Sequence, residues 1–450
     1  MNRYLPLIIV LAVLTGTELE AQSLRPAPKL VVNVAIDQLR TDYIEQFSPY
    51  YTADGFKKLL QEGAIYEAAS YPFSPVDRAS AIAAIATGTT PLYNNIVSST
   101  WLDRTTLRLV GSVDDEKYGT SPAKMATSTV GDELKVATGG NAIVCGVAAE
   151  RDAAVLSAGH AADGAFWFDQ STKRWTTGSY YDKQAQNLVR LYNGGHTYGL
   201  TNEAVSQFAQ SCVSDLAMGK DAIPDLLNIT FSLRVPDTEN SAAEVQMAYL
   251  KLDYTLASLV KGIESRVGKD NVLFVLTGTG YTDEAPVDYA SYRIPTGTFY
   301  INRTANLLNM YLGAIYGQDR YVEACHHNQI FLDHKVLEQR RIGYGDIITR
   351  SKELLLQASG VRGVAQSPYS SAVSGDLVLD IAPGWQVLNE DTHEQFTSRA
   401  AFVPFPIILY GTDIQAEHIL TPVTTDRIAP TIAKAIRIRA PNACSAAPLR

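Results

Sequence analysis

Short apolar runs that alternate with helical patterns restrict the fold of this chain more than any other feature. Leu30–Asp37 is such a run, ends on a carboxylate, and has a counterpart in Val272–Thr277. Continuous apolar runs are typical of strands buried on both faces, and helices between them favour parallel pairing. We therefore predict an α/β fold with a largely parallel sheet sandwiched by helices. The other expected strands are Ile143–Ala148, Leu227–Ser232 and Ile407–Tyr410, and the expected helices are Asp54–Glu62, Arg78–Thr87, Lys183–Tyr192, Glu244–Arg266 and Ile428–Ile436.

The segment from about 297 to 390 departs from this alternation, because it is more helical in pattern and rich in Tyr. The chain has 450 residues and 46% hydrophobic content, which is enough for a large core and for more than one unit. We therefore expect one main domain over residues 22–450, with a subdomain inserted near 297–390.

The first residues have the pattern of a secretory leader. Arg3 supplies a positive charge, an apolar stretch from Leu5 to Leu14 follows, and Ala21 offers a small residue for cleavage. The stretch is shorter than the ~20 residues that a membrane span needs. We predict that residues 1–21 are a signal peptide and that the mature chain is periplasmic or secreted, without a membrane span.

The charge balance argues against nucleic acid as a partner. The chain carries 38 Lys and Arg residues against 47 Asp and Glu residues, for a formal net charge of −9, and no basic run stands out. Nucleic-acid binders need a basic patch that neutralises phosphates. No nucleic-acid partner is therefore expected.

Several motifs occur in an order that resembles a known family. Pro28–Tyr43 looks like a first strand that carries a metal-binding Asp at Asp37, and Gly159–Phe168 is a further signature. These motifs resemble the alkaline phosphatase superfamily, in particular the monomeric periplasmic alkaline phosphatases related to nucleotide pyrophosphatase/phosphodiesterases. The resemblance covers almost the whole mature chain and implies the fold of that family. Its other carriers are Gly55–Gly63, Thr87-Gly88 with Pro91, Trp101–Asp103, Tyr249–Asp253 and Asp426–Ala433.

The resemblance also implies a reaction centre with two zinc ions, held by Asp and His ligands, and a metal-activated Thr or Ser nucleophile. The nucleophile position, ten residues before Gly88, is taken by Arg78. Arginine cannot lose a proton to become a nucleophile. Ser80 is near, but a shift of two residues along a helix turns a side chain about 200° away. Asp77 has the pattern of an N-cap.

The positions that hold the phosphate in the family also differ in this chain. Ser99 stands where the family has an Asn, and Glu150 and Asp152 stand where it has a Lys and an Arg. Two carboxylates in place of two cations repel a phosphate dianion. We therefore interpret all three as degenerate positions of the family's phosphate site.

By the same resemblance, most zinc ligands are replaced. Thr279 and Gly280 stand in place of an Asp-His pair, and Pro404 stands in place of the final His. Positions 197–325 contain no His, although imidazole is a preferred zinc ligand. Asp37 is a vestigial ligand, and we expect neither a bound metal nor another cofactor.

Three further groups that contain His are weaker candidates for a metal site. Asp391 and His393 have the look of the family's Asp-Thr-His motif but come too early in the chain. Cys325–His327 looks like a metal cluster, yet adjacent residues point in different directions, so we expect a structural role. His160, within the Gly159–Phe168 signature, is expected to serve the fold.

The replacement of the nucleophile, the phosphate site and the zinc ligands together predicts a pseudoenzyme, a catalytically inactive member of the superfamily. It would be a binding or scaffold component of the cell envelope, with another exported or outer-membrane protein as its partner. The alternative is a divergent metal-dependent phosphomonoesterase or phosphodiesterase with a relocated site, drawn from Asp37, Asp77, Asp391 and His393. A third hypothesis, a carbohydrate-binding envelope component, rests on the 24 Tyr residues, which suit stacking on sugars.

Overall fold

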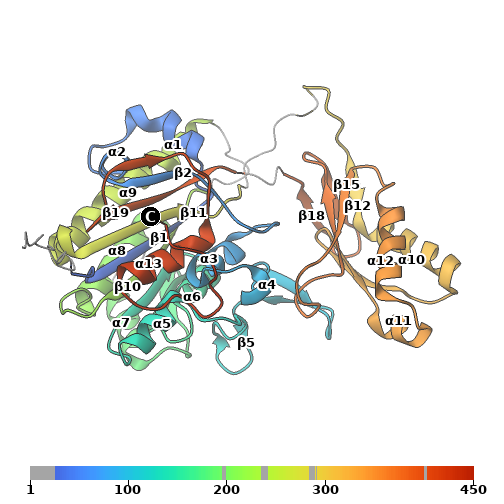
Figure 1. Cartoon of the computed structure of the whole chain (residues 1–450), viewed down its shortest axis with the longest axis horizontal. Helices are drawn as coiled ribbons and strands as arrows, with labels where there is room; N and C mark the ends of the chain where they lie inside the picture. The colour runs from blue at the N-terminus through green and yellow to red at the C-terminus, as the bar shows by residue number, and fades with distance from the viewer. Residues whose placement is uncertain are drawn as a thin grey trace, which may run out of the picture.

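A ten-stranded sheet lies at the centre of the larger lobe of the computed structural model (Figure 1). The structure describes residues 26–194, 199–234, 242–282, 289, 291–399 and 403–449. In spatial order the strands are β20 (Glu417–Ile419), β2 (Ala64–Ser70), β19 (Phe405–Gly411), β11 (Val272–Gly278), β1 (Leu30–Asp37), β10 (Asp225–Ser232), β7 (Val144–Ala148), β8 (Gly164–Asp169) and β9 (Arg174–Thr177), with β21 (Val423–Thr424) beside β2.

The middle of this sheet is parallel. The neighbours β11, β1, β10, β7 and β8 run in one direction, whereas β19 is antiparallel to β11 and β2, and β9 is antiparallel to β8. Every residue of β1 is buried, as expected for a strand that is covered on both faces. The predicted α/β fold with a largely parallel sheet is therefore confirmed.

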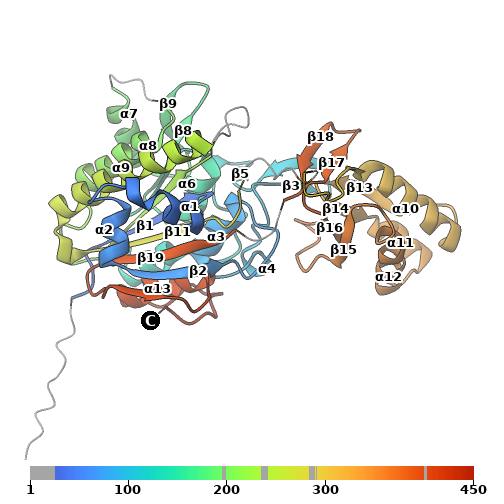
Figure 2. The same ribbon diagram turned by 90° about the horizontal axis from the view of Figure 1, so that it is seen from above.

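Helices form a layer on each face of the sheet (Figure 2). The chain therefore buries both sides of its apolar strands, which is the reason that those strands need no polar alternation. One layer consists of α1 (Thr41–Phe47), α2 (Phe56–Glu62), α7 (Lys183–Tyr192), α8 (Asn202–Asp215) and α9 (Ala242–Val267). The other layer consists of α3 (Arg78–Thr87), α5 (Val130–Ala137), α6 (Arg151–Ala158) and α13 (Ile428–Ala435), with the short α4 (Pro91–Asn94) after α3.

Helix α3 begins and ends where the sequence predicts, and both ends have a physical cause. The Asp77 side chain accepts a hydrogen bond from the backbone N–H of Ser80, and the Ser80 hydroxyl accepts one from the backbone N–H of Asp77. This reciprocal capping box satisfies backbone donors that a helix start leaves open. Gly88 ends the helix in the left-handed conformation with φ 65°, which glycine adopts without strain. The first residue of the helix, Arg78, is thereby held at a defined place.

A second lobe is formed by residues 298–397, which overlap the segment near 297–390 for which the sequence predicts an inserted subdomain (Figure 1). Its apolar side chains, among them Leu308, Ile347 and Leu377, form a hydrophobic cluster separate from that of the large sheet. One of its sheets has the order β12 (Thr298–Tyr300), β17 (Gln386–Asn389), β18 (Glu394–Thr397), and the other has the order β13 (Val322–His326), β14 (Gln329–Leu332), β16 (Leu377–Ile381), β15 (Val361–Gln366). Its helices are α10 (Ile301–Tyr316), α11 (His334–Arg340) and α12 (Tyr344–Leu355).

A hairpin of the larger lobe, β3 (Thr100–Asp103) with β4 (Arg108–Gly111), reaches the second lobe through Arg104. The Arg104 guanidinium donates hydrogen bonds to Glu323 at 2.9 Å, to Asp376 at 3.0 Å and to three backbone carbonyls of the second lobe. The Asp376 side chain is 2% exposed, so its charge needs these donors. A smaller hairpin, β5 (Asp114–Asp115) with β6 (Gly119–Thr120), follows in the chain.

We predict that Arg104→Ala weakens the second lobe by about 3 kcal/mol, because it leaves the buried Asp376 carboxylate short of a charged partner. Urea unfolding followed by limited proteolysis of residues 298–397 measures the effect. Arg362→Ala is the control, since its pair with Asp380 is half exposed on both sides and is expected to contribute less than about 1 kcal/mol. Equal losses in the two variants would contradict the anchoring role of Arg104.

The part of the chain that the structure describes contains no helix long and apolar enough to cross a membrane. The predicted signal peptide, residues 1–21, lies outside the described residues.

Candidate functional site

The carboxyl ends of the parallel strands meet at one edge of the large sheet, which is where α/β proteins of this kind bind ligands. Asp37 ends β1, Thr279 follows β11, and Glu150 lies between β7 and α6. Arg78 is the first residue of α3 and lies at the same edge. Its guanidinium interacts electrostatically with Asp37, Glu150 and Asp152. The structure therefore brings together four of the residues that the sequence singled out, Asp37, Arg78, Glu150 and Asp152.

Arg78 is the cation at the centre of this group. Its Nη2 donates to both carboxylate oxygens of Asp152, at 3.1 Å each, and the two side chains are 20% and 12% exposed. Burial opposes the charge on Arg78, but Asp152, Glu150 and Asp37 together raise its pKa above the ordinary value. The position to which the sequence resemblance assigns the family's nucleophile is thus occupied by a permanent cation, fixed by an ion pair.

Two carboxyl groups beside Arg78 have raised pKa values. Asp37 is 2% exposed, and this burial raises its pKa to about 6, although Arg78 and hydrogen bonds from Thr279 and Tyr281 act in the opposite direction. Burial also raises the pKa of Glu150, against the attraction of Arg78. Carboxyl groups whose protonation changes closer to neutral pH are typical of functional sites.

We predict that Asp37→Asn stabilises the protein at pH 8 by about 3 kcal/mol, since the pKa of Asp37 is raised from 3.8 to about 6 on folding. The folded chain binds the Asp37 proton more tightly than the unfolded chain. That contribution to stability is complete below pH 3.8 and is lost as the pH rises through about 6. Asparagine keeps the shape and an acceptor oxygen without the charge.

Urea unfolding of both proteins at pH 4 and pH 8 measures this difference. The gain from Asp37→Asn is expected to be large at pH 8 and close to zero at pH 4. A gain of the same size at both pH values would show that burial of the Asp37 charge is not its cause.

The residues at the other positions that the sequence resemblance assigns to zinc ligands do not fit a pair of zinc ions. The Thr279 hydroxyl is fully buried and donates to Asp37 at 2.8 Å. Gly280 has φ 74°, and a Cβ atom there would lie 2.7 Å from the Tyr71 ring. Pro404 has no ligating side chain, and its carbonyl accepts from the backbone of Thr41. Of these positions only Asp37 offers a metal-ligating atom, so we derive no step through a two-zinc centre.

Ser99 and Ser80 belong to the start of α3 rather than to an open site. The Asp77 carboxylate accepts hydrogen bonds from the backbone N–H of Ser99 at 2.6 Å and from the Ser80 hydroxyl at 2.9 Å. The predicted N-cap role of Asp77 is confirmed. Ser80 is fully buried and is not available as a nucleophile.

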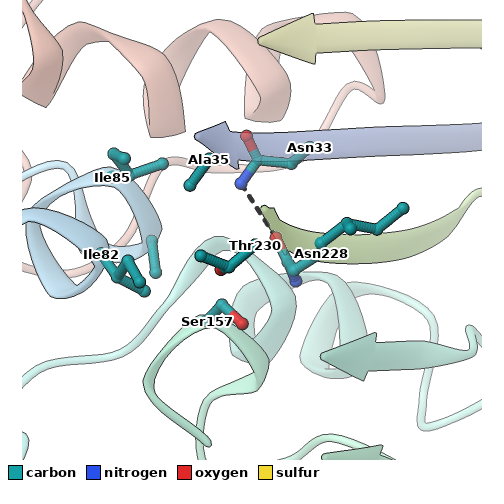
Figure 3. A pocket seen from close by; sticks show the side chains of 9 residues that line it. Asn33, Ala35, Ile82, Ile85, Ser157, Asn228 and Thr230 are labelled. Atoms are coloured by element: carbon teal, nitrogen blue, oxygen red, sulfur yellow. Dashed lines mark hydrogen bonds between the residues drawn. The ribbon is translucent and has the colours of Figure 1, made fainter. Parts of the chain in front are cut away.

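A small cavity lies behind this edge, between β1, β10, α3 and α6 (Figure 3). The Asn33 amide donates to the Asn228 carbonyl oxygen at 2.9 Å across the two strands. The other polar atoms of both amides and the Thr230 hydroxyl have no partner within the described residues. The cavity measures about 10 Å³, which is the size of one water molecule. It is therefore too small for a substrate.

The remaining His candidates lie elsewhere. His160 contacts the Asp132 carboxylate and the Met125 carbonyl, at 3.0 Å each, which confirms its role in the fold. Asp391 and His393 lie in the connection between β17 and β18 of the second lobe, and both are exposed. The expectation that Cys325–His327 side chains point apart is wrong for the two His residues. Their rings are 4.7 Å apart, and both contact the carboxylate of Glu394.

The sheet order, the two helical layers and the charged carboxyl edge define an α/β protein of the alkaline phosphatase type. Residues 31–402 match the model of the type I phosphodiesterase / nucleotide pyrophosphatase family. The chain belongs to this family, within the alkaline phosphatase superfamily.

Individual relatives agree with this assignment. Alkaline phosphatase PafA of Elizabethkingia meningoseptica is 23% identical, with 94% of each chain covered. Alkaline phosphatase PhoV of Synechococcus elongatus is 24% identical, with 92% of this chain and 91% of that protein covered. The crystal structure of wild-type PafA superposes with a TM-score of 0.81 at 24% identity, over 94% of this chain and 98% of the other.

These findings overturn the prediction that the chain is not an enzyme. Two relatives that cover more than nine-tenths of it are named as alkaline phosphatases. The described residues also contain a group that can hold a metal ion, His326, His327 and Glu394. The prediction failed because it considered only the positions at which the family has its catalytic residues. The tertiary structure also brings together His326, His327 and Glu394, which no local sequence motif links.

Proposed function

We propose that the protein is a hydrolase of phosphoric esters, with its reaction centre at the carboxyl edge of the large sheet around Arg78. The strongest support for it is the Arg78 guanidinium, which is only partly engaged by its carboxylate partner. Within the described residues only its Nη2 is engaged in hydrogen bonds, both of them to Asp152. A planar guanidinium with further N–H donors suits the oxygens of a phosphoryl group. The family and the two alkaline phosphatases support the same reaction class.

The charge at this edge favours a phosphodiester over a phosphomonoester. Three carboxyl groups, Asp37, Glu150 and Asp152, lie around Arg78. Arg234 adds a second cation close to Glu150. When all five groups are ionised, three negative charges face two positive charges. A diester with one negative charge is repelled less by this surplus than a monoester dianion.

The chain's own residues support direct attack by water. Position 78 carries no hydroxyl, and the Ser80 hydroxyl is buried against Asp77. In the proposed step, Arg78 binds the phosphoryl oxygens and orients the ester. Glu150, which is only partly buried, takes a proton from the attacking water. The new P–O bond forms as the ester P–O bond breaks; the departing alkoxide takes a proton from solvent, and Glu150 releases its proton to solvent.

We predict that Arg78→Ala lowers kcat/KM for bis-p-nitrophenyl phosphate about 100-fold or more, since a charged donor to the phosphoryl oxygens is lost. Steady-state release of p-nitrophenol, measured with bis-p-nitrophenyl phosphate and p-nitrophenyl phosphate from pH 5 to 9, tests this. The diester is expected to be the better substrate at pH 8.

Arg151→Ala is the matched control, because Arg151 is the next residue to Asp152 but forms an exposed pair with Asp114. Its activity is expected to equal that of the wild type. Failure of the wild-type protein to hydrolyse either ester above the buffer rate, with or without added divalent metals, would refute the proposal. An Arg78→Ala variant with wild-type activity would move the reaction away from this edge.

We also propose that the protein is exported and meets an exported or outer-membrane partner. The leader pattern that ends at Ala21 supports export. N-terminal sequencing of the protein from its native source is expected to begin at Gln22. A mature chain that still begins at Met1 would contradict export by signal-peptide cleavage.

A further inference from the structure

Three potential metal ligands converge in the second lobe, outside the site described above. His326 ends β13, His327 lies in the two-residue connection to β14, and Glu394 begins β18. His326 Nδ1 lies 3.1 Å from Glu394 Oε2, and His327 Nε2 lies 3.2 Å from Glu394 Oε1. One ligand atom of each side chain lies within 4.8 Å of the others. Two separate sheets of the lobe therefore contribute to one cluster.

These separations match the spacing of ligands around one metal ion. Two ligands at ~2.1 Å from a zinc ion, at the tetrahedral angle, lie about 3.4 Å apart. The two nitrogen–oxygen distances of 3.1 and 3.2 Å require only small movements to reach this spacing. From this geometry we infer that His326, His327 and Glu394 bind one divalent transition metal ion, of the class that includes zinc.

The donor set determines the class of metal. Two imidazole nitrogens and one carboxylate suit zinc and iron(II), whereas calcium and magnesium prefer oxygen ligands throughout. Within the described residues, the one polar contact of the His326 ring is with Glu394, because its Nε2 is buried without a partner. In the described part of the chain, no other acceptor competes for the orientation of the His326 ring toward the cluster.

The surroundings leave one side of the cluster open. The His327 side chain is 51% exposed, while those of His326 and Glu394 are 13% and 21% exposed. The Phe396 ring packs on the His327 ring, with centroids 4.9 Å apart. Three protein ligands with an accessible side are typical of metal sites that keep a position for water or substrate, rather than of closed structural sites.

The cluster faces the larger lobe. β18 lies on the side of the second lobe that faces the large sheet (Figure 1). His327 interacts electrostatically with Asp77, the residue that caps α3 directly before Arg78. A metal ion at the cluster would therefore add positive charge next to an edge that has a surplus of carboxylates. The metal site rests on its own geometry and does not depend on the proposed hydrolase function.

The test is the zinc content of the full-length mature protein after incubation with excess zinc and dialysis, measured by elemental mass spectrometry. About one zinc ion per chain is expected for the wild type. His327→Ala and Glu394→Gln are each expected to weaken zinc binding at least tenfold in a competition titration with a chromophoric chelator. Cobalt(II) in place of zinc is expected to give visible ligand-field bands that both variants lose.

His418→Ala is the matched control, because His418 forms a pair with Glu67 at 2.8 Å and belongs to no group of potential metal ligands among the described residues. It is expected to retain zinc like the wild type, as is Asp37→Asn. Zinc-free wild-type protein, or zinc retention in His327→Ala at the wild-type level, would overturn the inference. Loss of zinc in Asp37→Asn alone would place the metal at the sheet edge instead. Circular dichroism of each variant separates loss of a ligand from loss of the fold.

Discussion

The ion pair between Arg78 and Asp152 is the interaction on which the charged carboxyl edge of the large sheet depends. Arg78 is the first residue of α3, and Asp152 lies in the first turn of α6, so the pair joins two helices of the same layer. The Arg78 guanidinium of this pair also supplies positive charge that partly compensates the buried Asp37 carboxylate. Removal of a partner from such a pair leaves an uncompensated charge in a poorly solvated place. The pair therefore stabilises the packing of α3 against α6 at this edge.

The packing around Gly280 and Thr279 limits what this edge can hold. The Tyr71 and Phe405 rings would lie 2.7 and 3.0 Å from a Cβ atom at Gly280, so this position cannot take a larger side chain without movement. The Thr279 hydroxyl donates a hydrogen bond to Asp37 and fixes the orientation of its carboxyl group. Because function resides in sites and not in folds, the charge and shape of this edge bear on the substrate more directly than the family assignment does.

The second lobe adds a separate set of chemical groups. Arg104 anchors the β3–β4 hairpin to it through Glu323 and Asp376. Asp376 in turn accepts hydrogen bonds from the backbone of Leu332, from His334 and from Tyr344. This satisfied polar network fixes the hairpin of the larger lobe against the second lobe, which is consistent with the electrostatic contact between His327 and Asp77. The charged edge around Arg78 therefore lies on the larger lobe, and the His326, His327 and Glu394 cluster lies on the second lobe. Each lobe has its own hydrophobic core.

Five strands and five helices of the larger lobe could be predicted from the sequence, because buried apolar runs and capping residues are local signals. Leu30–Asp37 and Arg78–Thr87 were predicted with the bounds that they have in the structure. Local signals also placed Asp37 and Arg78 at strand and helix ends. The tertiary structure pairs Arg78 with Asp152, which lie 74 residues apart in the chain and are linked by no local signal. It alone joined His326 and His327 to Glu394 across two sheets, because long-range packing, and not sequence spacing, sets the distance between such side chains.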